Sequence, residues 1–82
     1  MARTHRAPLT TEQFSAFLAY CRRDLPGTTP HQRATAAALV VMHLRHRDMP
    51  AGWLPAILYA HGVPRMARAL ADILTYGEVL PY

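Results

Sequence analysis

The stretch TTPHQRATAAALVVMHLRHR, residues 28–47, carries the clearest helix signal in the chain. Thr29 is placed to cap a helix, Pro30 suits the first helical position, and Gln32 completes a capping box with the threonine. Residues 34–44 are apolar at nearly every position, and a helix that is apolar all round is buried all round. The sequence therefore predicts a helix at the centre of the fold, or one that a second subunit partly buries.

Prolines and glycines divide the rest of the chain into three amphipathic helices, expected at about residues 11–24, 53–61 and 64–76. No segment shows the alternation that is typical of strands. We therefore expect an all-α fold, a compact bundle of four short helices with the second helix central. The predicted core consists of Phe14, Phe17, Leu18, Cys21, Ala37, Ala38, Val41, Leu44, Ile57, Leu58, Leu70, Ile73 and Leu74.

The length of the chain, 82 residues, suits one domain and no more. Hydrophobic residues make up 51% of the sequence and charged residues 17%, which argues against a disordered chain. We expect residues 1–8 to form a flexible basic arm and residues 9–82 to form a single helical domain.

Positive charge dominates the sequence, which has nine arginines, no lysine and a formal net charge of +4. This balance favours an acidic partner such as nucleic acid, and it excludes a DNA mimic, which must be strongly acidic. The alternative is a solvated surface that reflects a GC-rich genome.

The single cysteine, Cys21, excludes a secreted module stapled by internal disulfides. The first residues are not followed by the apolar core of a signal peptide. The longest apolar stretch, residues 36–42, is far shorter than the roughly 20 residues that cross a bilayer. We expect a cytoplasmic protein of a bacterium, or of a phage in its host, with no membrane partner.

The residues that usually perform catalysis are scattered. The acids are spread one per element, and Ser15 lacks the neighbours of a nucleophile elbow. Cys21 fits a core position better than a thiolate–histidine pair. His43 and His46 lie three apart on one helix, but a metal ion needs further ligands. We expect no enzyme, cofactor, metal or small-molecule substrate.

The helices expected within residues 54–74 resemble a helix-turn-helix unit. In such a unit a glycine, here Gly62, permits the turn, and the second helix enters the major groove of DNA. Its leading exposed side chains would be Arg65 and Arg68, and arginine is the usual reader of guanine. Leu58 is larger than the residue usual at its position, and Arg68 stands where an apolar residue is usual. An ordinary helical hairpin is therefore the alternative.

Further arginines would hold the phosphate backbone in this interpretation. They lie in the basic arm and at the end of the second helix, and they are Arg3, Arg6, Arg45 and Arg47. The sequence thus predicts a small non-enzymatic DNA-binding regulator of a bacterial or mobile-element kind, from a phage or plasmid.

A second interpretation is a small protein-binding inhibitor or adaptor that blocks or bridges a host protein complex. Tryptophan and tyrosine are frequent interface hot spots, and Trp53, Tyr59 and Tyr76 are the candidates. Val40 and Met42 belong to a helix with more apolar surface than its small neighbours can cover. This surplus also predicts a homo-oligomer, most simply a homodimer.

Overall fold

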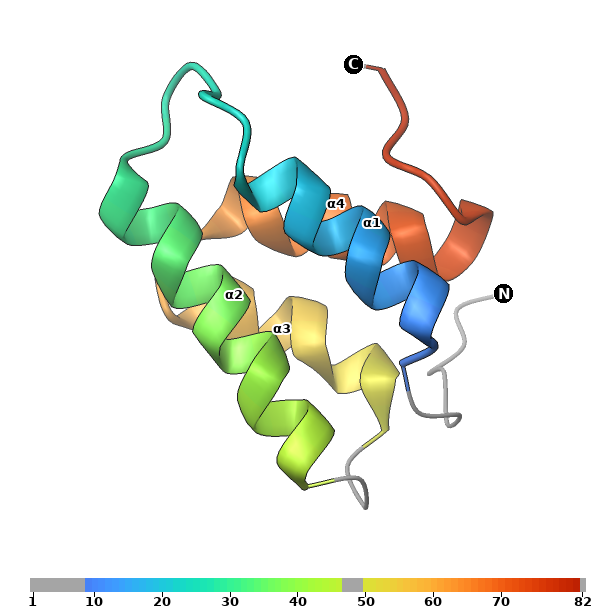
Figure 1. Ribbon diagram of the computed structural model, residues 1–82. Helices are drawn as coiled ribbons and strands as arrows, with labels where there is room; N and C mark the ends of the chain where they lie inside the picture. Colours follow the sequence, from blue (N-terminus) through green and yellow to red (C-terminus); the bar gives the residue numbers. More distant parts are fainter. Residues whose placement is uncertain (1–8, 47–49, 82) are drawn as a thin grey trace.

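The computed structural model describes residues 9–46 and 50–81, and this part of the chain is helical without strands (Figure 1). The elements are α1 (Thr11–Cys21), α2 (Pro30–Arg45), the 3₁₀ turn η1 (Ala51–Trp53), α3 (Leu54–Ala60) and α4 (Pro64–Tyr76). The predicted all-α bundle of four short helices is confirmed. The basic arm expected at residues 1–8 lies outside the described residues.

Helices α1 and α2 begin with the same capping box, formed by Thr10 with Gln13 and by Thr29 with Gln32. In each box the threonine hydroxyl accepts a hydrogen bond from the glutamine backbone N–H at 3.1 Å. The glutamine side chain in turn accepts a hydrogen bond from the threonine backbone N–H at 2.9 Å. These bonds satisfy N–H groups that a helix start leaves without partners, and they confirm the predicted start of α2.

The most buried helix is α4. Seven of its thirteen residues are buried, against three of sixteen in α2. Leu70 and Ile73 are fully enclosed, because α4 packs against α1, α2 and α3. Helix α2 also contacts the three other α-helices, as expected of a central helix, but exposed residues such as Ala34 and Ala38 show that it lies at the surface. By burial, the central position expected for the second helix belongs to α4.

Outside α2, the predicted core agrees closely with the observed one. The predicted residues that are buried are Phe17, Cys21, Leu58, Leu70, Ile73 and Leu74. Those that are half-buried are Phe14, Leu18 and Ile57.

The core face of α2 differs from the predicted one. Ala36, Val40 and His43 are buried, whereas Ala38 is exposed and Val41 is half-buried. The predicted face is wrong because a helix that is apolar on nearly every side has no periodic pattern to set its rotation. The assignment of Val40 to a protein interface is also wrong, since its side chain is fully buried.

We expect Val40→Asp to unfold the domain and Val41→Asp to lower its melting temperature much less. Val40 is 0% exposed, so its replacement would place a carboxylate in an apolar core. An unpaired buried charge costs about 3–5 kcal/mol, a large part of the about 5–15 kcal/mol by which domains are stable. Thermal melting followed by far-UV circular dichroism tests this pair, and equal losses for both variants would contradict the observed rotation of α2.

Candidate functional site

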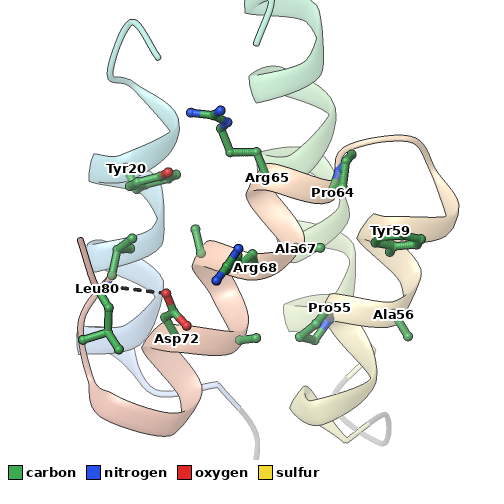
Figure 2. A pocket seen from close by; sticks show the side chains of 13 residues that line it. Tyr20, Pro55, Ala56, Tyr59, Pro64, Arg65, Ala67, Arg68, Asp72 and Leu80 are labelled. Atoms are coloured by element: carbon green, nitrogen blue, oxygen red, sulfur yellow. Dashed lines mark hydrogen bonds between the residues drawn. The ribbon is translucent and has the colours of Figure 1, made fainter. Parts of the chain in front are cut away.

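A groove with a volume of about 860 Å³ follows the exposed side of α4 (Figure 2). Arg65 and Arg68 lie along it, one turn apart, together with the smaller Ala67 and Ala71. They line the groove because Met66, Leu70 and Ile73 occupy the opposite side of the helix and are buried. The helical period of α4 therefore places most of its core side chains away from the groove, while Ala67 belongs to both.

Helix α3 forms one wall of the groove with Pro55, Ala56 and Tyr59. These residues share one side of the helix because residues one turn apart are neighbours on its surface. Tyr59 is 69% exposed, and it forms part of the rim beside Pro64 (Figure 2). Most of this wall is thus apolar, and its aromatic ring lies open to solvent.

The opposite wall consists of Tyr20 from α1 and of Val79 and Leu80 from the C-terminal segment. Gly77, with φ at +82°, ends α4 in the left-handed conformation and turns the chain back. The buried Asp72 carboxylate accepts a hydrogen bond from the Leu80 backbone N–H at 3.3 Å, drawn as a dashed line in Figure 2. Val79 packs against the hydrophobic core. The segment is therefore fixed beside α4 by both polar and apolar contacts.

The start of α4 is the positively charged end of the groove. The Arg65 guanidinium lies against Gly27 in the α1–α2 loop, so close that a Cβ added there would be 3.6 Å from the arginine nitrogen. At the end of α1, the Arg23 guanidinium lies 5.9 Å from the centre of the Tyr20 ring, a cation–π contact. Arg65, Tyr20 and Arg68 all line the groove. Its positive charge is thus gathered where α1 ends and α4 begins.

The arginines predicted to bind DNA are not all brought together. Arg65 and Arg68 share the groove, while Arg45 is exposed at the end of α2. Figure 1 shows that this end of α2 lies well apart from the start of α4. The other predicted contacts, Arg3, Arg6 and Arg47, lie outside the described residues.

The α3–α4 hairpin has part of the expected helix-turn-helix geometry. Gly62 adopts a positive φ of +79°, and Val63 is buried directly after it, as such a turn requires. Leu58 is fully buried and Arg68 is exposed, so both sequence departures are accommodated. The hairpin is compatible with either interpretation of this segment.

The predicted protein-interface residues divide between the groove and other surfaces. Tyr59 lines the groove, whereas Trp53, Tyr76 and Met42 are more than half exposed outside its lining. The sequence analysis missed Tyr20 as a site residue, because its place in the wall depends on how α1 packs beside α4. The homodimer stays a prediction.

Comparison with known proteins gives no assignment, since no family model matches the chain and no curated protein or solved structure is significantly similar. Among residues 9–46 and 50–81, no three histidine, cysteine or acidic side chains are grouped to hold a metal ion. None of the helices in these ranges has the length and hydropathy needed to cross a membrane.

Cys21 is a buried residue of the core, and its sulfur lies 3.9 Å from that of Met66. Burial raises the pKa of the Cys21 thiol to about 11, although the positive charge of Arg33 acts in the opposite direction. Because the thiolate is the reactive form of cysteine, this thiol is a poor nucleophile near neutral pH.

We expect the free energy of unfolding to fall between about pH 9 and pH 11 by about 2 kcal/mol more in the unmodified protein than in Cys21→Ala. The unfolded thiol ionises near its ordinary pKa of 9.0, while the folded thiol keeps its proton up to a pKa of about 11. Ionisation therefore stabilises the unfolded state first. Urea titrations across this pH range measure the difference, and identical pH profiles for the two proteins would contradict a buried thiol.

Proposed function

We propose that this chain is a small helical protein-binding module, an inhibitor or adaptor, which takes a segment of a partner protein in the α4 groove. The observation that carries this proposal is the largely apolar groove of about 860 Å³ that opens along the exposed side of the most buried helix. Its volume falls in the range of binding pockets, about 300–1,000 Å³. Apolar grooves beside helices are a common way to bind an amphipathic helix or peptide.

The chemistry of the walls supports a peptide as the occupant. Pro55, Ala56 and Leu80 offer apolar surface, and Tyr20 and Tyr59 add aromatic rings with a polar hydroxyl. Tyrosine combines apolar area with hydrogen bonding, which is why it is enriched in interfaces. Rigid walls on α1 and α3 would also reduce the conformational entropy lost on binding.

DNA binding is the second candidate, and the observation that favours it is the exposure of Arg65 and Arg68 one turn apart near the start of α4. Two features support it less well than a protein partner. A reading helix must enter a major groove about 12 Å wide, and α4 is flanked on both sides by groove walls. Arg45 is at a distant helix end, so it does not extend the same basic surface (Figure 1).

The protein-binding proposal predicts that a displayed library of random twelve-residue peptides yields binders that occupy the groove. In ¹H–¹⁵N NMR spectra, the selected peptides should shift the backbone signals of groove residues. Ala56→Gln should weaken binding roughly fivefold or more, because it places a long polar side chain in the apolar wall. Ala60→Gln is the matched control, since Ala60 is exposed on the same helix outside the groove lining. Peptides that bind equally well to both variants would refute the groove.

The DNA-binding candidate makes a separate prediction for random-sequence duplex DNA. Contacts to several phosphates release counterions, so affinity should fall roughly a hundredfold or more between about 50 and 200 mM salt. The double variant Arg65→Ala and Arg68→Ala should lose most of the DNA binding. Its binding to peptides selected from the library is measured for comparison. Absence of DNA binding near 50 mM salt, measured by fluorescence anisotropy, would eliminate this candidate.

A further inference from the structure

We infer that the partner segment carries an aspartate or glutamate next to apolar residues, and that Arg65 is the anchor for its carboxylate. This inference rests on the proposed protein-binding function and adds the chemical class of the partner. It follows from the uneven distribution of charge and apolar surface along the groove.

Arg65 lies in a position suited to an anchor. It is exposed at the start of α4, and its guanidinium lies against the Gly27 backbone on the α1–α2 loop. The planar guanidinium presents several N–H donors in the geometry that a carboxylate accepts in pairs.

Two further arginines lie near this end of the groove. Arg68 follows one turn later on the same side of α4 and also lines the groove. Arg23 lies over the Tyr20 ring, and that ring belongs to the adjacent wall. The charge of Arg23 therefore adds to that of Arg65 in attracting an anion, and the formal net charge of +4 acts in the same direction.

The acidic side chains among the described residues leave Arg65 without an ion pair. Arg65 forms no ion pair with another residue in the described ranges, and Asp24 lies instead beside Arg33 at 3.9 Å. Asp72 lines the groove, but its carboxylate is buried and accepts the backbone N–H of Leu80. A carboxylate from a partner would thus complement the charge of Arg65.

Beyond the arginines, the groove continues over apolar side chains. Pro55 and Ala56 on α3 face the groove from one wall, and Val79 and Leu80 do so from the other. A segment with its carboxylate at Arg65 would therefore need apolar side chains to follow along α4. Nucleic acid offers the anion without such side chains, so the apolar walls favour an acidic peptide over phosphate.

The test uses peptides selected from the twelve-residue library against the full chain. Selected sequences should be enriched in aspartate or glutamate adjoining apolar residues. For one such peptide, Arg65→Gln should weaken binding roughly tenfold, the effect of losing one charge-assisted hydrogen bond. Arg45→Gln is the matched control, because Arg45 is an exposed arginine at the distant end of α2, and binding should be unchanged.

A second peptide, in which the acid is replaced by its amide, completes a double-mutant cycle. Arg65→Gln should leave the affinity for this amide peptide nearly unchanged, because the pair has already been removed. An unchanged far-UV spectrum for the variant shows that the fold is intact. Fluorescence anisotropy at about 50 and 200 mM salt measures all four affinities.

The outcomes separate this inference from the proposed function. Selected peptides that lack acids but lose affinity with Ala56→Gln would overturn the acidic anchor and leave the groove as the binding site. Acidic peptides that are indifferent to Arg65→Gln would also overturn the anchor. Duplex DNA that displaces the peptide, and whose binding is lost with Arg65→Gln, would assign the arginine to phosphate instead. Absence of any groove-binding peptide would overturn both proposals.

Discussion

The burial of α4 is the constraint on which the rest of the structure depends. Leu70 and Ile73 are fully enclosed, and the helix packs against α1, α2 and α3 at once. Enclosure of most of its surface leaves one strip of α4 exposed, and the neighbours that enclose it stand on both sides of that strip. The groove is thus a direct consequence of core packing, since the helices that bury α4 also form the groove walls.

How far the sequence predicts this fold depends on how unevenly each helix distributes its apolar residues. The apolar and polar sides of α4 are distinct, so the buried positions Leu70, Ile73 and Leu74 are predicted correctly. Helix α2 offers no such contrast, and its rotation is predicted wrongly. Val40 is buried while Ala38 is exposed, an arrangement with little penalty because alanine exposes little apolar area. The starts of α1 and α2 were predictable because capping is local chemistry.

The candidate site divides in the same way between local and tertiary information. Arg65 and Arg68 were predicted from the helix-turn-helix-like pattern around Gly62, and Tyr59 was predicted because tyrosine is a frequent interface hot spot. Tyr20 completes the groove from a segment distant along the chain, and Leu80 completes it from the C-terminal segment that turns back after α4. Their contribution depends on the packing of α1 and on the backbone turn at Gly77, which only the folded chain reveals.

The proposed binding site and the core could be varied independently, because they lie on different sides of α4. Side chains at Arg65 and Arg68 are exposed, and a change there alters charge without disturbing Met66 or Leu70 on the buried side. The wall formed by the C-terminal segment is different. Asp72 is buried and holds the Leu80 backbone, so the same carboxylate contributes to packing and to the shape of the groove. A change at Asp72 would therefore affect the fold as well as the groove, because loss of this acceptor would leave the partly buried Leu80 backbone N–H to find another partner.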